Sequence, residues 1–269
     1  MIIMKKSTIY YTLIIIIIVV AIIGIELYSG VYPPFSVVES YSMEHSNYWQ
    51  PGIIDEGSIV FVKKVNSIND IKTYVTGRSS DYRTYGEYGN VILYHDGPRI
   101  IIHRAMFYLE WNQEKPVILG YNNQSWIKIY NNDVIVLYNI GYAHRNLMIN
   151  VSRYIGDSGF ITAGDHNVAT IPKDSIYYNK TYNAYCATDQ TLFNIKPVTL
   201  NQIVGVAYGD IPWFGLYKLN ILRLEGKWPE IYADHVPRYS YLYLYTTTTI
   251  ILILIFMPYG KISRSLRKK

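Results

Sequence analysis

Apolar residues gather at the two ends of this chain, whereas apolar and polar residues are mixed along the middle. Ile9 to Ile25 is an uncharged run of 17 residues, and with Ser7 and Thr8 in front it can cross about 30 Å of hydrocarbon as a helix. Residues 239–259 form a second uncharged run with a tyrosine at each margin, which is typical of interfacial anchors. Its threonines would also suit a buried strand. The pattern predicts two transmembrane helices, over residues 8–28 and 239–259.

Basic residues beside these runs indicate how the chain would sit in a membrane. Seven of the 25 Lys and Arg residues lie in two short tails, residues 1–7 and 260–269. Because Lys and Arg are enriched on the cytoplasmic side, we expect a multi-pass protein of the cell membrane with residues 29–238 outside the cytoplasm. The rest of the chain has 18 basic and 20 acidic residues, so the formal charge of +5 comes from the tails. A nucleic-acid partner, which needs a basic face, is not expected.

The first run is also longer than the apolar core of a cleaved targeting peptide. No small-x-small cleavage site follows Glu26, Leu27 and Tyr28. We therefore expect the first helix to be a retained anchor.

The middle of the chain has the pattern of a mainly β domain. Apolar, β-branched runs of strand length are separated by clusters of Gly, Asn, Asp and Pro. The expected strands are Ser58–Val65, Asn90–Tyr94, Ile100–Met106, Pro116–Gly120, Val134–Tyr138, Phe160–Thr162 and Ile203–Ala207. Since closing a sheet removes edges that would pair with other chains, we expect an antiparallel β-barrel-like domain. Periodicity alone leaves a mixed α/β fold open, and Thr76–Gly89 looks like an exposed insertion.

Cysteine and sequon positions add little constraint. The single cysteine, Cys186, allows no intrachain disulfide. Asn-x-Ser/Thr sequons at Asn123, Asn150 and Asn179 fit an extracytoplasmic domain, but the sequence does not decide which carry glycans. Histidines at metal-ligand spacing with acidic partners do not occur in the sequence, so we expect no metal and no cofactor.

Five segments carry the strongest functional signal, and they occur in a characteristic order. They are PFSVVESYSMEHS at 34–46, EGSIVFVKKV at 56–65, IIHRAM at 101–106, FITAGDHN at 160–167 and IVGVAYGDIPWFG at 203–215. In order and character this set resembles the type I signal peptidases, in particular the archaeal and endoplasmic-reticulum branch, whose base is a histidine. The resemblance implies the β-fold shared by signal peptidases and LexA-like proteins, and it implies the activity of a serine endopeptidase. Its partners would be the lipid bilayer and the signal peptides of secretory preproteins, cut at small-x-small sites; the oligomeric state stays open.

The resemblance assigns the nucleophile and its neighbour. Ser42 matches the family's nucleophile in a serine-methionine box, and Ser40 matches the serine whose hydroxyl helps to form the oxyanion hole. Hydrolysis of an amide needs both an activated nucleophile and donors for the oxyanion. Two departures stand here: Tyr41 where glycine is frequent, and Glu44-His45-Ser46 in place of a proline-containing tail.

His103, in the pair His103-Arg104, matches the family's general base, and an imidazole titrates close to neutral pH. His45 is the nearest rival, three residues from Ser42. The acid of the triad is less defined, because Ile171 stands where relatives carry their second aspartate. Asp174 is slightly favoured as the residue that orients His103, with Asp165 of the Gly-Asp-His-Asn turn as a structural acid or as the orienting residue itself.

Apolar residues near Ser42 are candidates for substrate contact. Val37, Val38 and Met43 could line shallow pockets for the signal peptide, or they could be ordinary core residues. A different class of function is an inactive membrane-anchored envelope or scaffold protein with a β-rich outer domain. The ordered set of five segments favours the peptidase.

Overall fold

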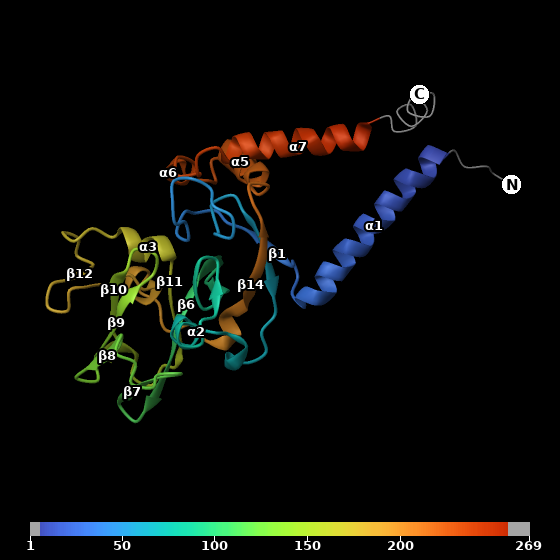
Figure 1. The fold of residues 1–269 in the computed structure, drawn as a ribbon. Helices are drawn as coiled ribbons and strands as arrows, with labels where there is room; N and C mark the ends of the chain where they lie inside the picture. Colours follow the sequence, from blue (N-terminus) through green and yellow to red (C-terminus); the bar gives the residue numbers. More distant parts are fainter. Residues whose placement is uncertain (1–5, 258–269) are drawn as a thin grey trace.

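The fold is known from a computed structural model that describes residues 6–257 (Figure 1). Its first element is helix α1 (Lys6–Ser29), which contains the N-terminal apolar run and ends before Gly30, a residue in the left-handed conformation. Its 24 residues span about 36 Å at 1.5 Å per residue. By length and composition, α1 is able to cross a membrane over Tyr11–Ser29.

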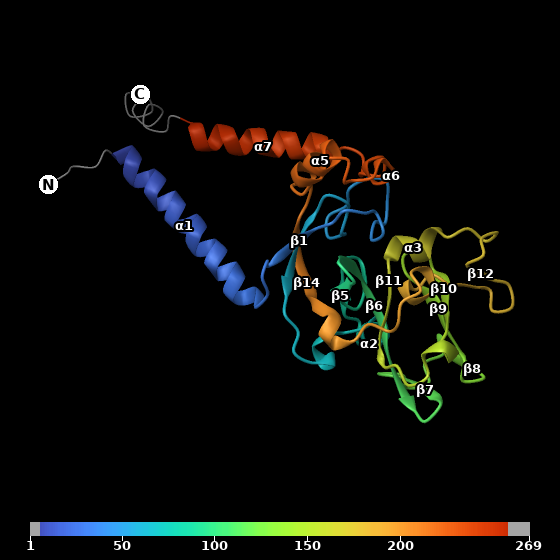
Figure 2. The same ribbon diagram turned by 180° about the vertical axis from the view of Figure 1, so that it is seen from behind.

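The second apolar run forms helix α7 (Ser240–Phe256), which leaves the domain on the same side as α1 (Figures 1 and 2). It has 17 residues and spans about 26 Å, less than the roughly 30 Å of a bilayer core. Its first turns also pack against α5 (Leu216–Leu224), with Leu244 buried beside Leu216 and Leu219. The structure therefore supports one candidate span, and the predicted multi-pass arrangement is not supported. Residues 1–5 and 258–269, with most of the basic tails, lie outside the described residues.

The larger of two main sheets has the strand order β1-β2-β14-β5-β6-β11, with β7 also paired to β6. Every pairing in it is antiparallel. Its strands are β1 (Phe35–Val37), β2 (Ile59–Lys63), β5 (Val91–Asp96), β6 (Arg99–Asn112), β7 (Lys115–Ile118), β11 (Gly159–Ala163) and β14 (Ile203–Ile211). The long strand β6 pairs with β5 through its first half and with β11 and β7 through its second half.

The second sheet has the order β12-β13-β10-β9-β8 and is antiparallel except for one parallel contact between β10 and β13. Its strands are β8 (Ile127–Tyr130), β9 (Val134–Ile140), β10 (Arg145–Asn150), β12 (Tyr178–Asn179) and β13 (Ala184–Tyr185). A core of buried aliphatic and aromatic side chains from both sheets holds them together, including Phe107, Leu109, Ile135, Leu137 and Ile161.

Neither sheet closes on itself among residues 6–257, so the predicted barrel is wrong and the antiparallel sheets are open. The two open sheets instead bury their apolar faces against each other in a shared core. Helix and strand contents are each about 30%, because α1 and α7 add helix to a β-sheet domain.

Short helices fill the connections between strands. They are α2 (Tyr74–Ser80), α3 (Asp165–Thr170), α4 (Asp189–Leu192) and α6 (Glu230–Ala233), together with 3-10 turns at Ile68–Asp70, Ser152–Tyr154 and Leu200–Gln202. These helices were not predicted from the sequence, because helices of one or two turns are too short to show a helical period.

The segment expected to be an exposed insertion, Thr76–Gly89, is exposed over Ser79–Arg83, but its two ends pack against the rest of the domain. It contains most of α2 and the hairpin of β3 (Arg83–Thr84) and β4 (Glu87–Tyr88). Gly77 and Glu87 are buried, so this segment is part of the wall behind the site described next.

Candidate active site

The nucleophile candidate lies in an irregular loop between β1 and β2. Two backbone hydrogen bonds tie the start of this loop to its end. The Val38 N–H donates to the Ser58 carbonyl at 2.9 Å, and the Gly57 N–H donates to the Val38 carbonyl at 3.0 Å. On the other side, the His166 N–H donates to the Ser42 carbonyl at 3.0 Å. The loop is therefore held between the start of β2 and the first turn of α3.

Ser42 and His103 meet in the structure, as the sequence analysis proposed. The Ser42 Oγ lies 2.8 Å from the His103 Nε2, although the two residues are 61 positions apart. His103 is 3% exposed and projects from the first half of β6. A hydroxyl at this distance can pass its proton to a neutral imidazole, which is the arrangement that activates a serine nucleophile.

The carboxylate behind the histidine is Asp189, a residue that the sequence analysis missed. Its two oxygens lie 2.8 and 2.7 Å from the His103 Nδ1. Asp189 is fully buried at the first position of α4, and the Tyr94 hydroxyl donates to its Oδ2 at 2.8 Å. The buried carboxylate therefore has two donors, and it fixes the tautomer in which Nδ1 carries the proton and Nε2 faces Ser42.

Neither acid proposed from the sequence contacts His103 in residues 6–257, so both proposals for the orienting residue are corrected. Asp174 is exposed in the loop after α3. Asp165 is buried but faces the other side of β6, where it pairs with Arg104. A local signal for Asp189 did exist: an aspartate directly follows the apolar stretch Ala184–Ala187 and a helix-capping threonine.

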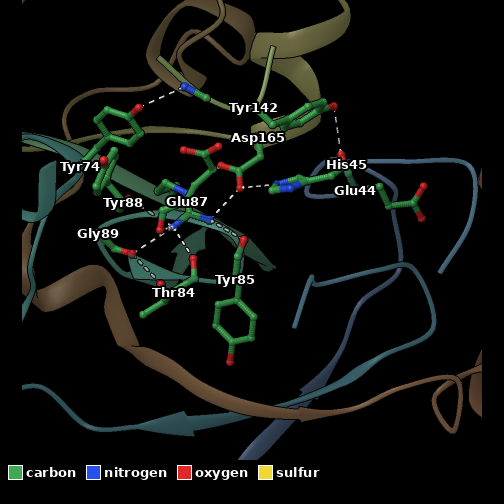
Figure 3. Close-up of polar contacts among 12 residues, drawn as sticks. Glu44, His45, Tyr74, Thr84, Tyr85, Glu87, Tyr88, Gly89, Tyr142 and Asp165 are labelled. Atoms are coloured by element: carbon green, nitrogen blue, oxygen red, sulfur yellow. Dashed lines mark hydrogen bonds and ion pairs between the residues drawn. The ribbon is translucent and has the colours of Figure 1, made fainter. Parts of the chain in front are cut away.

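Asp165 lies at the centre of a second polar cluster, shown in Figure 3. Arg104 donates to it through Nε at 2.8 Å and Nη2 at 2.7 Å, and the His45 Nε2 lies 3.0 Å from its Oδ2. Burial would raise the pKa of Asp165, but the charge and hydrogen bonds of Arg104 and the hydrogen bond of His45 outweigh it and hold that pKa at about 2. His45, the rival base, is thus turned away from Ser42.

The Ser40 hydroxyl lies 3.2 Å from the Ser42 hydroxyl, where it is able to donate to an oxyanion formed beside the nucleophile. Tyr41, between them, lies against residues of other elements. Its ring stacks on His235 at 4.0 Å and meets His166 and Tyr232 edge-on at 5.2 and 5.9 Å. The C-terminal segment around α6 thereby supports the nucleophile loop.

A groove of about 650 Å³ runs past Ser42 and His103. Its lining includes Ser36–Ser42 from β1 and the loop, Pro98–His103 from β6, and Asn167, Phe193, Lys218 and Tyr232. Val37 and Val38 are among the lining residues, although Val38 is largely buried and also belongs to the core; their contact with a substrate stays a prediction. Met43 does not line the groove: it is 1% exposed and packs in the core with Ile54, so for Met43 the expectation of substrate contact is corrected.

A group of acidic side chains lies behind the loop without a basic partner among residues 6–257. Burial raises the pKa of Glu44 to about 8, that of Asp55 to about 7 and that of Glu56 to about 9. Both carboxyl oxygens of Glu56 and one of Asp55 are buried without a hydrogen-bond partner. Burial therefore favours the protonated forms of Glu44 and Glu56 at neutral pH, and Asp55 titrates close to it. Over residues 6–257, no set of three or more His, Cys, Asp or Glu is arranged to hold a metal ion.

Compared with protein-family models, curated proteins and solved structures, the chain has no match.

Proposed function

We propose that this chain is a serine hydrolase that cleaves peptide bonds, with Ser42 as the nucleophile. The observation that carries the proposal is the chain of contacts from Ser42 through His103 to Asp189, with distances of 2.8 and 2.7 Å. Serine, histidine and aspartate in this order form the catalytic unit of many unrelated hydrolases, so the geometry defines the chemistry without requiring a shared fold.

In the proposed reaction, His103 removes the Ser42 proton through Nε2 while the Ser42 Oγ attacks the peptide carbonyl. Asp189 stabilises the imidazolium that forms, and Ser40 donates a hydrogen bond to the tetrahedral oxyanion. The imidazolium then returns the proton to the leaving amine, and water repeats the sequence on the acyl-enzyme.

We further propose that the substrate is a secretory preprotein and that the enzyme is a membrane-anchored signal peptidase of the archaeal and endoplasmic-reticulum type. The five ordered segments support this assignment, and α1 can tether the site beside a bilayer that also holds the signal sequence. Confining both reactants to one layer raises their effective concentration. The groove beside Ser42, lined by the short side chains of Val37 and Val38, would accept an extended segment with small residues before the scissile bond.

The test is cleavage of a preprotein with alanine at the first and third positions before the cut, using the full chain in lipid vesicles. Ser42→Ala should abolish cleavage and leave the melting temperature within a few degrees of the wild type. Ser46→Ala, four residues along the same loop, is the matched control and should cleave normally. Retained cleavage by Ser42→Ala would remove Ser42 from the mechanism, and a folded wild-type chain that never cleaves would favour the scaffold hypothesis.

A further inference from the structure

The strand that carries the proposed base also carries a buried arginine that faces the opposite way. Because neighbouring residues on a strand point to opposite faces, His103 projects toward Ser42 while Arg104 projects toward Asp165. Arg104 is 1% exposed and binds Asp165 through two short hydrogen bonds. Its Nη1 also donates to the carbonyls of Thr84 and Gly89 at 3.0 and 2.9 Å. Arg104 therefore joins β6 to the β3–β4 hairpin and to the start of α3.

His45 connects the nucleophile loop to this rigid group. Its Nε2 lies 3.0 Å from the Asp165 Oδ2, and the side chains of His45 and Asp165 are only 8% and 6% exposed. The His45 ring stacks on Tyr142 at 4.3 Å, and the Tyr142 hydroxyl donates to the Glu44 carbonyl at 3.2 Å. An ionised carboxylate only accepts hydrogen bonds, so the His45 Nε2 carries a hydrogen and donates a hydrogen bond to Asp165.

Several other contacts also hold the loop: Tyr41, before Ser42, stacks on His235, and Met43, after it, packs in the core with Ile54. The segment Ser40–Ser46 has no helix or strand, so its position depends on contacts from outside the loop. The Ser42 carbonyl is held by the His166 N–H, and the Glu44 Oε1 accepts from the Glu56 N–H at 3.1 Å. The His45–Asp165 hydrogen bond adds a tie of a different kind, because it connects the loop through Asp165 to Arg104, the residue next to the base.

We infer that His45 is a positioning residue: its hydrogen bond to Asp165 holds the Ser42 hydroxyl within proton-transfer distance of His103. The inference rests on the proposed function, since it concerns the same site. Proton transfer needs a separation of about 2.6–3.2 Å, and a displacement of about 1 Å in an active site costs about 10²-fold in rate. His45 does not touch the reacting atoms, so its effect on the reaction passes through the position of the loop.

The experiment compares His45→Leu, which keeps bulk and loses the donor, with His45→Gln, whose amide can still donate to Asp165. His45→Leu should lower kcat about 10²-fold with KM within about twofold, and His45→Gln should recover most of the loss. His95→Leu, at an exposed position on β5, is the matched control and should behave as the wild type. Melting temperatures are recorded for all variants.

A second readout needs no substrate. The change in the ¹⁵N chemical shift of the His103 Nε2 on Ser42→Ala substitution reports the hydrogen bond between the two residues. This change should be clear in the wild-type background and greatly reduced in the His45→Leu background.

The outcomes separate the two proposals. An undiminished kcat or an undiminished Ser42→Ala shift change in His45→Leu overturns the positioning role. Equal losses in the Leu and Gln variants, with a matching fall in melting temperature, also overturn it, because they indicate packing alone. If the wild type cleaves no preprotein but the shift change depends on His45 as described, the proposed function fails and the positioning role stands. A wild type without any shift change overturns the positioning role.

Discussion

Replacing Asp189 with asparagine removes one charge from the proposed triad and keeps the shape of the side chain. Asp189 is fully buried and accepts hydrogen bonds from both the Tyr94 hydroxyl and the His103 Nδ1. In the Asp189→Asn variant, an amide oxygen in the place of Oδ2 still accepts from Tyr94, and the NH₂ group takes the place of Oδ1, 2.8 Å from the His103 Nδ1, where it donates to an unprotonated Nδ1. The ring is then held in the tautomer whose Nε2 carries the proton, and it cannot accept the proton of Ser42.

The expected loss is large and specific. In Ser-His-Asp hydrolases the same exchange lowers kcat about 10⁴-fold, which corresponds to about 5 kcal/mol of transition-state stabilisation. We expect a loss of that order here, because two contacts of 2.7 and 2.8 Å to a nearly buried ring would be altered. The measurement is the initial rate of preprotein cleavage over a range of substrate concentrations, with the melting temperature recorded in parallel.

Asp174→Asn is the matched control, because Asp174 is the exposed residue that the sequence alone favoured. It should leave kcat within about twofold of the wild type. The assignment of Asp189 would be refuted by cleavage within tenfold of the wild type in Asp189→Asn, or by a comparable loss in Asp174→Asn.

Two further predictions concern the surroundings of the site. Gly164→Ala should lower kcat strongly, because a Cβ at this position would lie 2.5 Å from the Ser42 carbonyl oxygen and would push the loop away. The measurement is preprotein cleavage by a folded variant. Full activity would contradict the close packing of Gly164 against the loop. Glu44, Asp55 and Glu56 have folded pKa values raised to about 8, 7 and 9, above the values near 4 of the unfolded chain. The folded state therefore binds more protons, so the stability of the domain should fall as the pH rises above about 4; the contribution of Asp55 is lost by about pH 7, that of Glu44 by about pH 8 and that of Glu56 by about pH 9. Thermal unfolding at several pH values tests this: Glu56→Gln should flatten the dependence, and a melting temperature that rises over this range would contradict it.

Much of the fold could be predicted from local sequence. The seven expected strands all occur, and most extend one or more residues beyond the predicted limits, as β6 does from Arg99 to Asn112. Alternation and β-branched composition act locally, so they are visible in the sequence. The open pair of sheets was not predictable in the same way, because closure depends on which distant strands pair.

The site divides along the same line. Ser42 and His103 each stand in a short recognisable segment, and the structure brings them together. Asp189 stands 86 residues beyond His103 and reaches it only because α4 packs against β11 and the Tyr94 hydroxyl holds the carboxylate. Asp165 lies in the Gly-Asp-His-Asn turn on which the resemblance was based, but its side chain binds Arg104 on the other side of β6.

By itself, therefore, the sequence determined the apolar N-terminal helix, most of the long strands and the two residues proposed to exchange a proton. These depend on composition and spacing within a few residues of each other. The tertiary structure decided which acid contacts His103, that Met43 belongs to the core, and that His45 contacts Asp165 rather than Ser42. Side-chain partners across distant strands and loops follow from register and packing, which no local pattern contains.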